Sequence, residues 1–437
     1  MKSYLGIDLG STTSKAVLLD ENEQVIGRGI TNTRANYDVA VEVARREALA
    51  DALLSRVLGP LGERGAEAAR AFRFEGDLHR LRQLRQTCRS VASAIPGDGA
   101  RLVPEMDTLM ARVVDVADEL FGGGARDRGA FFRDLVGARF YSALDEACAR
   151  GQLDFDRLSG IYDRAILQVE NQLDEVPFID ALEAALRRTP SIDAAEREAT
   201  LRTGIDAVRH PPEIAAMVGT GYGRARLPFA RECIRSEILC HGMGAHAMFP
   251  ATRTVLDIGG QDTKAIQVDG AGLVTGFQMN DRCAAGCGRY LGYIADELNL
   301  ALQELGPLAL TADKPCRITS TCTVFAGIEL RDLLAVGEKR ENVLAGLHRA
   351  IVTRAMSLLA RSGGVNDQLT FTGGVAKNPA CTGALTELVS RHYGPRTINI
   401  SADSIYTGAL GGALFARRDL RVPDVTEPTK ECATCID

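Results

Sequence analysis

Two stretches of this chain repeat one pattern of residues that is suited to holding phosphates and a divalent cation. In each stretch an apolar run ends in an acid, Asp8 or Asp257, and a glycine follows two positions later. The two copies align without a gap at a constant offset of 249 residues, which indicates two halves of one design. The identical residues face each other in this order: Asp8, Gly10, Lys15, Ala16, Asp20, Val25 and Gly27 against Asp257, Gly259, Lys264, Ala265, Asp269, Val274 and Gly276.

The chemistry of the two turns follows from their residue types. A glycine lets backbone amides approach a phosphate closely, and a neighbouring carboxylate can hold Mg²⁺ directly or through water. We therefore predict that Asp8 and Asp257 are catalytic residues that hold Mg²⁺, and that both turns bind the phosphates of one ATP or ADP molecule. The alternative is a pair of tight hairpin turns with solvated acids. The predicted phosphate-binding residues are Gly10, Ser11, Thr12, Thr13, Ser14 and Lys15 in the first turn, and Gly259, Gly260, Gln261 and Asp262 in the second.

A third glycine-rich segment, residues 371–378, follows a strand-like run and precedes a helix-like run. Paired glycines at such a junction let a flat base lie against the backbone, which suits adenine and ribose. A purely structural turn is the alternative. Residues 407–414 are mostly small and predict a helix for close packing at a hinge. The predicted nucleoside-binding residues are Gly373, Gly374, Val375, Lys377 and Asn378.

Strands and turns must position these residues. Each copy of the repeat reads as a strand, a turn, a second strand and a polar turn before a third strand, so we expect an α/β protein with two β-meanders. Between residues 59 and 205 the strand signals disappear, and apolar residues recur at helical spacing. This all-helical insertion is either a solvated decoration or a docking surface. The expected division is residues 1–58 and 206–250 for the first ATPase subdomain, 59–205 for the insertion, 251–420 for the second subdomain and 421–437 for a flexible tail.

Composition narrows the possible partners. Lysine and arginine total 51 against 57 acids, a net charge of -6, which argues against binding to a nucleic-acid backbone. The sequence has no apolar run as long as a membrane span and no signal-peptide core, so we expect a cytoplasmic protein without a membrane partner. Eleven cysteines, an odd number, suit free thiols and metal ligands better than a disulfide framework.

The two phosphate turns, the paired glycines and the small-residue helix resemble the actin, sugar kinase and heat-shock-protein-70 ATPase superfamily. That resemblance implies an actin-like (ribonuclease H-like) fold with two lobes. More narrowly, residues 6–15 and the segment Asp-Arg-Cys-Ala-Ala-Gly at 281–286 are similar to the activators of 2-hydroxyacyl-CoA dehydratases and the ATP-binding subunits of benzoyl-CoA reductase. The resemblance covers about residues 1–40 and 210–417. Simple dimeric activators lack so large an insertion, so the resemblance favours the benzoyl-CoA reductase subunit, with a homodimeric dehydratase activator as the alternative.

Cys283 and Cys322 each precede a predicted helix, and the partial positive charge there lowers a thiol's pKa and favours a negatively charged cluster. The resemblance implies that both residues ligate a [4Fe–4S] cluster shared with a homologous ATPase subunit. Such a cluster takes four thiolates, so the partner supplies the other two. The alternative for both cysteines is a buried small hydrophobic residue.

The remaining cysteines have weaker contexts. Cys287, one helical turn after Cys283, is either a substitute ligand or a neighbouring thiol. Cys432 and Cys435 have CxxC spacing, but polar, proline-containing sequence precedes them and favours a disordered end over a metal site. Three further cysteines are interpreted as core or surface thiols, and the two histidines near the first of them as core polarity rather than a zinc site: Cys240, Cys316 and Cys381, with His241 and His246.

The expected activity is conformational. We expect ATP hydrolysis to rotate the two lobes, move the cluster-bearing helices and drive electrons from ferredoxin to acyl-CoA-reducing subunits, the donor and acceptor being implied by the resemblance. Glu237 is a candidate for orienting the attacking water, or else a solvated helical acid. The rival functions are a small-molecule kinase of the same fold and a chaperone-like ATPase switch, neither of which needs the cysteine pair.

Overall fold

The computed structural model describes residues 1–33, 36–122, 131–149, 153–173, 176–221, 227–280, 288–298, 300–318 and 323–418. The chain divides into two compact units. One consists of residues 1–33 together with 212–437, and the other of residues 34–211. The cysteines Cys283, Cys287, Cys322, Cys432 and Cys435, and the expected tail, lie outside the described residues.

The first sheet contains the first copy of the repeat. Strands β1 (Lys2–Leu9), β2 (Thr13–Asp20) and β3 (Val25–Asn32) form an antiparallel meander, and β4 (Glu213–Gly221) adds to β1 in parallel. The order is β3-β2-β1-β4. Asp8 pairs with Lys15 across β1 and β2.

The second sheet repeats this plan, which confirms the meander predicted from the repeat. Strands β5 (Thr252–Ile258), β6 (Thr263–Val268) and β7 (Val274–Asn280) are antiparallel, and β8 (Gln368–Thr372) lies parallel to β5. A short strand, β9 (Thr397–Asn399), extends the order to β7-β6-β5-β8-β9. Asp257 pairs with Lys264, so both acid and lysine pairs sit at equivalent places in the two sheets.

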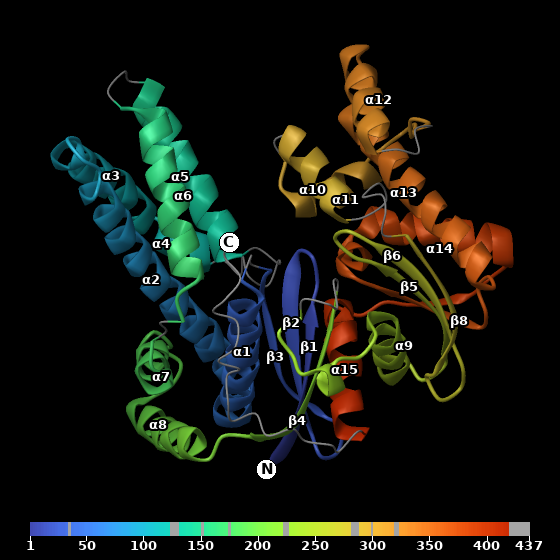
Figure 1. Ribbon diagram of the computed structural model, residues 1–437, viewed down its shortest axis with the longest axis horizontal. Helices are drawn as coiled ribbons and strands as arrows, with labels where there is room; N and C mark the ends of the chain where they lie inside the picture. Colours follow the sequence, from blue (N-terminus) through green and yellow to red (C-terminus); the bar gives the residue numbers. More distant parts are fainter. Residues whose placement is uncertain are drawn as a thin grey trace, which may run out of the picture. The chain divides into compact units, whose positions relative to one another are not determined.

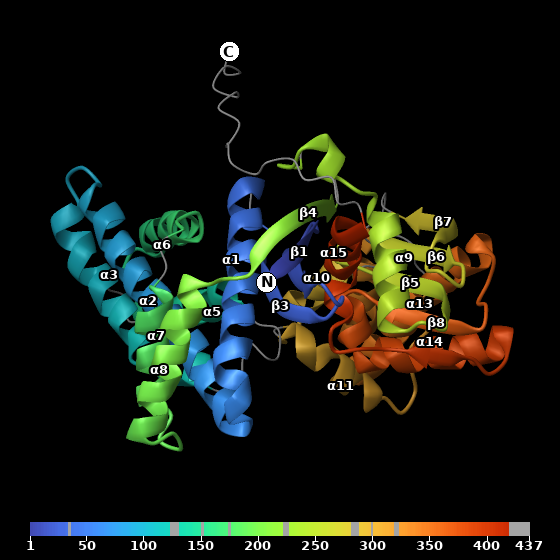
Figure 2. The same ribbon diagram turned by 90° about the horizontal axis from the view of Figure 1, so that it is seen from below.

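Helices α9 (Glu237–Met248) and α15 (Thr407–Arg418) lie side by side, with α15 against the first sheet and α9 between α15 and the second sheet (Figures 1 and 2). Their crossing depends on glycines. A Cβ at Gly411 would lie 1.8 Å from the Cys240 carbonyl oxygen, and one at Gly244 would lie 2.0 Å from the Thr407 carbonyl oxygen. The small-residue helix expected at 407–414 is therefore a helix packed backbone to backbone against α9.

The second sheet has its own large core. Helices α13 (Arg340–Ser362) and α14 (Pro379–Tyr393) pack with it, and buried side chains such as Leu256, Phe371 and Leu347 fill the space. By length and composition α13 resembles a membrane span, but its apolar residues form part of this core. The other helical segments of this unit are α10 (Gly288–Glu297), α11 (Leu305–Leu310) and α12 (Thr323–Ala335), with short 3₁₀ turns at 231–233, 302–304, 374–377 and 404–406.

The unit of residues 34–211 contains only helices among its described residues. Its helices are α1 (Tyr37–Leu58), α2 (Glu63–Ser93), α3 (Gly99–Val114), α4 (Ala117–Gly122), α5 (Phe132–Ala149), α6 (Phe155–Glu170), α7 (Phe178–Arg187) and α8 (Ala194–Arg209). Phe140 and Tyr162 stack at 4.1 Å between ring centroids inside its core. The unit is wider than the 59–205 interval because α1 packs against α2 and α8.

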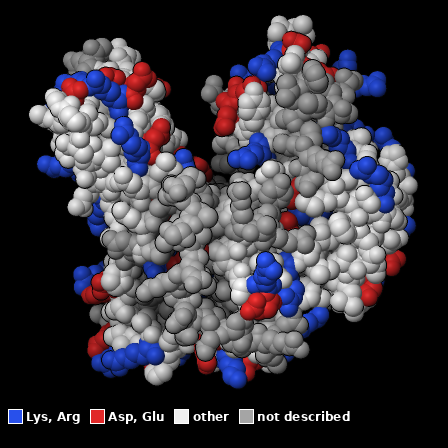
Figure 3. All heavy atoms as spheres, viewed as in Figure 1, with Lys and Arg blue, Asp and Glu red and all other residues white. Residues whose placement is uncertain are grey.

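Charges of both signs are interspersed on the surface of the helical unit (Figure 3). Many of them form ion pairs along or between its helices, for example Arg45 with Glu42 at 2.7 Å and Arg64 with Glu196 at 2.7 Å. Exposed pairs of this kind contribute little to stability, about 0–1 kcal/mol each. The stability of this unit therefore comes from its apolar core.

Candidate functional site

The two predicted phosphate turns face each other. A Cβ on Gly260 would lie 2.1 Å from Thr12 Oγ1 and 3.7 Å from Ser11 Oγ, so the backbone of one turn touches the hydroxyls of the other. The same backbone bond closes both turns: the Gly10 amide donates to the Thr13 carbonyl at 3.2 Å, and the Gly259 amide donates to the Asp262 carbonyl at 3.0 Å. The repeat therefore folds into two matching turns that contact each other.

One predicted phosphate ligand has a supporting role instead. Ser14 is buried, and its hydroxyl lies 3.0 Å from Thr33 Oγ1. Thr33 Oγ1 donates to the Gly10 carbonyl at 2.6 Å, so Ser14 must be the donor in its own contact with Thr33. The Ser14 side chain thus stabilises the first turn from behind. Ser11, Thr12, Thr13 and Gln261 lie in the turns and are at least partly exposed.

The two lysines of the repeat differ in their surroundings. Lys15 Nζ lies 3.4 Å from Asp8 Oδ2, and no other ion-pair partner is found for it among the described residues. Lys264 Nζ lies within 3.3 Å of three carboxylates, those of Asp257, Asp262 and Glu237. The Lys264 side chain is 1% exposed and that of Lys15 is 11% exposed. Only Lys15 is free to meet a phosphate, whereas Lys264 is an internal counter-ion.

The electrostatic balance around Asp257 explains its ionisation. Burial alone would raise the pKa of Asp257, but His241 and Lys264 hold that pKa well below the usual range. Its Oδ1 also accepts a hydrogen bond from Thr372 Oγ1 at 2.9 Å. Burial lowers the pKa of Lys264, but the carboxylates of Asp257 and Glu237 raise it well above its ordinary value. Both groups are charged in the folded protein.

Helix α9 brings two more polar residues next to Asp8 and Asp257. Glu237 and His241 are four residues apart and therefore share one helix face. His241 Nδ1 lies 3.3 Å from Asp257 Oδ1, and His241 Nε2 lies 4.0 Å from Glu237 Oε1. Burial raises the pKa of Glu237, with Lys264 offsetting the effect only in part. Burial lowers the pKa of His241, but Asp257 and Asp8 more than compensate, so its pKa is raised.

The sequence left open whether Glu237 is a site residue or a solvated acid, and in the structure it lies in the site. His241 also lies in the site, although the sequence predicted a core residue. The spacing of four residues between Glu237 and His241 on one helix is the signal that could have identified the histidine. Cys240, the neighbour that suggested zinc, is buried and is not among the residues whose ligand atoms gather here.

The residues fit a divalent cation. Asp8 is 3% exposed, and its Oδ1 has no hydrogen-bond partner among the described residues. One ligand atom each from Asp8, Glu237 and His241 lie within 4.8 Å of one another. The four ionised carboxylates of Asp8, Asp257, Asp262 and Glu237 contact two lysines and His241, so even with His241 protonated one negative charge remains for a cation to balance. Oxygen ligands of this kind suit Mg²⁺.

The third glycine site lies against the second turn. Gly373 has φ +85°, and a Cβ there would lie 2.3 Å from the Ile258 carbonyl oxygen, so no side chain fits. Gly374 and Lys377 are exposed, and a Cβ on Gly374 would meet open space. These two residues are available to a ligand. Val375 is buried in the core of the second sheet.

Asn378 uses its side chain within the fold. Its Oδ1 accepts hydrogen bonds from the amides of Ala380 and Cys381 and so caps α14. His348 Nδ1 lies 2.6 Å from the Leu344 carbonyl, which can only accept, so Nδ1 carries the proton. His348 Nε2 therefore accepts from Asn378 Nδ2 at 2.9 Å. These bonds use the Asn378 oxygen and one of its two amide N–H groups, so the side chain mainly stabilises the start of α14.

The second turn is also bonded to α10. The Gly288 amide donates to the Gly259 carbonyl, and the Arg289 amide donates to the Gly260 carbonyl, both at 2.8 Å. These amides are the first two of α10 and have no partner within the helix. The phosphate turn and the helix that begins five residues after Cys283 are therefore one hydrogen-bonded assembly. Cys283 itself lies outside the described residues.

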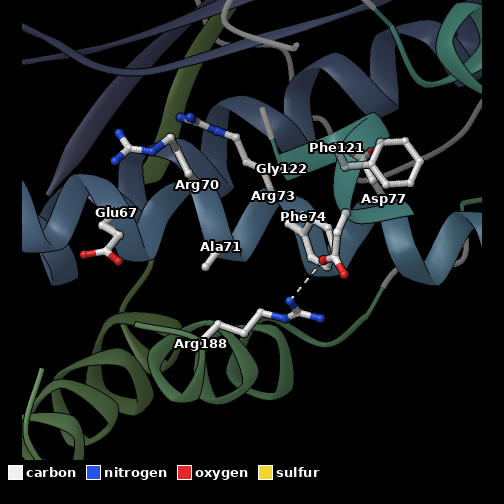
Figure 4. Close-up of a pocket in the computed structure, with 10 residues that line it drawn as sticks. Glu67, Arg70, Ala71, Arg73, Phe74, Asp77, Phe121, Gly122 and Arg188 are labelled. Atoms are coloured by element: carbon white, nitrogen blue, oxygen red, sulfur yellow. Dashed lines mark ion pairs between the residues drawn. The ribbon is translucent and has the colours of Figure 1, made fainter. Parts of the chain in front are cut away.

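A separate pocket lies in the helical unit (Figure 4). Phe74, Phe121 and Arg188 line it, and the Arg188 guanidinium stacks 4.2 Å from the Phe74 ring centroid. Arg188 also pairs with Asp118 at 3.5 Å and with Glu75. These acids already neutralise the positive charge of Arg188, so this guanidinium is not available to a phosphate. In this respect the pocket differs from the two phosphate turns.

Comparison with known proteins agrees with this geometry. Residues 5–416 match the model of the BadF/BadG/BcrA/BcrD ATPase family. Over 204 residues the chain is 42% identical to the (R)-2-hydroxyglutaryl-CoA dehydratase activating ATPase of Acidaminococcus fermentans, an alignment that covers 47% of this chain and 76% of that protein. Over 175 residues it is 33% identical to a benzoyl-CoA reductase subunit of Thauera aromatica, covering 40% and 62% of the two chains.

A solved structure shows the same fold. The activator of 2-hydroxyisocaproyl-CoA dehydratase from Clostridium difficile with bound ADPNP superposes with a TM-score of 0.53 at 21% identity, covering 96% of this chain and 95% of that one. The fold is therefore the actin-like ATPase fold that the sequence predicted. By its sequence match and its fold, the chain belongs to the BadF/BadG/BcrA/BcrD ATPase family.

Proposed function

We propose that this chain hydrolyses ATP in order to activate electrons for an acyl-CoA-processing enzyme, through a [4Fe–4S] cluster that Cys283 and Cys322 share with a homologous subunit. The observation that carries the proposal is the pair of hydrogen bonds from the first amides of α10 to the carbonyls of Gly259 and Gly260. A change in the second phosphate turn must move or break these bonds. The start of α10 is the point where the Cys283 segment joins the fold.

The nucleotide site is assigned to the two facing turns. Backbone amides of Gly10–Thr13 and Gly259–Asp262 surround the phosphates, and Lys15 supplies the free positive charge. Gly374 and Lys377 border the nucleoside. Asp8 would hold the Mg²⁺ that accompanies ATP, and Glu237 beside it would orient the attacking water with the carboxylate oxygen that the cation leaves free. Bound Mg²⁺ would neutralise charge that develops on the phosphates.

Two kinds of enzyme are candidate partners. The 42% identity to an activating ATPase supports a 2-hydroxyacyl-CoA dehydratase. The helical unit of residues 34–211 supports the role first expected, as a subunit of benzoyl-CoA reductase that receives electrons from ferredoxin. Co-purification under anaerobic conditions separates them. A stable complex with homologous and acyl-CoA-reducing subunits supports the reductase, and a homodimer that associates only transiently supports the dehydratase activator.

Iron analysis of the anaerobically purified protein tests the cluster itself. We expect visible absorbance and bound iron in the wild type, and loss of both in Cys322→Ala while ATP binding survives. Cys316→Ala is the matched control, because Cys316 is a half-buried free cysteine that our assignment does not use. A colourless wild type, or full iron content in Cys322→Ala, would contradict the proposal and favour a kinase or an ATPase switch of the same fold.

A further inference from the structure

We propose that Asp8, Glu237 and His241 form a direct binding site for a divalent transition-metal cation such as Mn²⁺, and that Asp257 orients the histidine. The inference deepens the proposed ATPase, because it names the cation chemistry of the same site. It does not depend on the nucleotide, since all the ligands come from the chain. It also differs from the pair of Asp8 and Asp257 that the sequence predicted.

Asp8 has a carboxylate oxygen that is available to bind a cation. Its Oδ2 faces Lys15 at 3.4 Å, while its Oδ1 is buried and has no partner among the described residues. A buried carboxylate oxygen without a hydrogen bond is costly, by about 1–3 kcal/mol or more for a charged group. A cation at Oδ1 removes that cost.

The two nitrogens of His241 have different neighbours. Nδ1 lies 3.3 Å from Asp257 Oδ1, an ion-pair contact rather than a well-aligned hydrogen bond. Nε2 points to Glu237 and Asp8. A histidine that binds a metal through one nitrogen usually donates the proton of the other nitrogen to a carboxylate. His241 is placed for this arrangement, because Nε2 faces the proposed ligands and Nδ1 lies 3.3 Å from Asp257 Oδ1.

Asp257 is less suited to contact the cation itself. Thr372 and His241 face its Oδ1, and Lys264 lies 3.3 Å from its Oδ2. Both oxygens therefore have neighbours, unlike Asp8 Oδ1. Lys264 also holds Glu237 through a 2.9 Å contact with Oε1, which fixes the second carboxylate beside His241.

Gly408 leaves room for the ion. A Cβ at this position would lie 2.8 Å from His241 Nε2 and 3.0 Å from Asp8 Oδ2, so a side chain there would crowd both residues. Ligands of one ion at about 2.1 Å lie about 3–4 Å apart. The 4.0 Å between Glu237 Oε1 and His241 Nε2 fits this range.

The donor set predicts the preferred metal. Mg²⁺ favours oxygen ligands, whereas an imidazole nitrogen with two carboxylates suits cations such as Mn²⁺ and Fe²⁺. We therefore expect nucleotide-free protein to bind Mn²⁺ more tightly than Mg²⁺.

Electron paramagnetic resonance with Mn²⁺ tests the site in the full-length, nucleotide-free protein. We expect one tight Mn²⁺ per chain, with pulsed spectra that show modulation from an imidazole nitrogen. His241→Gln should abolish this modulation and weaken binding at least about tenfold, and Asp257→Asn should weaken binding about 10- to 100-fold. His246→Gln, on the same helix but outside the site, should change neither.

The wild-type spectrum decides the matter even if a variant fails to fold. Tightly bound Mn²⁺ without nitrogen modulation, or modulation that persists in His241→Gln, would overturn the site, as would an absence of Mn²⁺ binding without nucleotide. A failure of the proposed ATPase and electron-activating function would give a different experimental result. Protein that shows the nitrogen-coupled Mn²⁺ but binds neither ATP nor iron would retain this site and refute the electron-activating role.

Discussion

Lys15 and Lys264 are equivalent residues of the sequence repeat, yet Lys15 faces one carboxylate and Lys264 faces three. The difference arises because α9 approaches only the second lysine and brings Glu237 to it. Asp262, the residue two before Lys264, adds another carboxylate, whereas Thr13 holds the corresponding place before Lys15. The same residue type is thus an internal counter-ion of three carboxylates in one half and has a single carboxylate partner in the other.

Substituting the two lysines should separate these roles. Lys15→Met should weaken ATP binding and should lower the free energy of unfolding by less than Lys264→Met does, because Lys15 contacts one carboxylate and Lys264 contacts three. Lys264→Met should lower the free energy of unfolding by about 3–5 kcal/mol, because it leaves buried carboxylates without their cation. Urea denaturation and nucleotide titration measure the two effects. Equal loss of stability in both variants would show that the lysines are not specialised.

The first amide of α10 offers a test of the link between nucleotide and helix. Gly288→Pro removes the N–H that bonds to Gly259, and proline is tolerated at the first position of a helix. We expect ATP binding to survive, and the nucleotide-dependent change in hydrogen exchange along α10 to be reduced. Gly288→Ala adds a similar Cβ but keeps the amide, so it is the matched control. An identical exchange response in the proline and alanine variants would rule out this link.

The crossing of α9 and α15 should tolerate no side chain at its closest point. Gly411→Ala places a Cβ 1.8 Å from the Cys240 carbonyl oxygen and should destabilise the protein by about 3 kcal/mol. Gly383→Ala is the control, since it lies exposed within α14 and its Cβ meets open space. That change should stabilise by about 0.5–1 kcal/mol, because alanine favours the helix. Thermal unfolding of both variants checks the opposite signs.

His348 should make stability depend on pH. Burial lowers the pKa of His348 below its ordinary value near 6.5, although its bond to Leu344 opposes the shift. The unfolded chain therefore takes up a proton at a higher pH than the folded protein does. Stability from this residue is fully present above about pH 6.5 and is lost as the pH falls below that value.

Comparing wild type with His348→Gln isolates this contribution. Urea midpoints measured between pH 8 and 5 should fall more steeply for the wild type than for the variant. His241, whose pKa shifts in the opposite direction, is present in both proteins and so cancels from the difference. A wild-type midpoint that rises relative to the variant at low pH would contradict the expected sign.

Much of the site could be predicted because it depends on local pattern. The repeat fixed which acid pairs with which lysine, since a β-meander of constant turn length sets the strand register. Gly10, Gly259 and Gly373 are positions where the backbone closes a turn or approaches another strand, and glycine marks such positions in a sequence. Helical spacing likewise predicted that the inserted region is all helical.

The amino-acid sequence by itself therefore determined the two matched turns, their acids and the α/β plan. Only the tertiary structure decided that His241 joins the site, that Ser14 and Asn378 serve the fold, and that Lys264 is a counter-ion. These roles depend on which side chains from distant segments meet when α9 packs against both sheets. Hydrogen-bonding capacity is then used up by whichever partner lies within about 3 Å, and no local pattern records that partner.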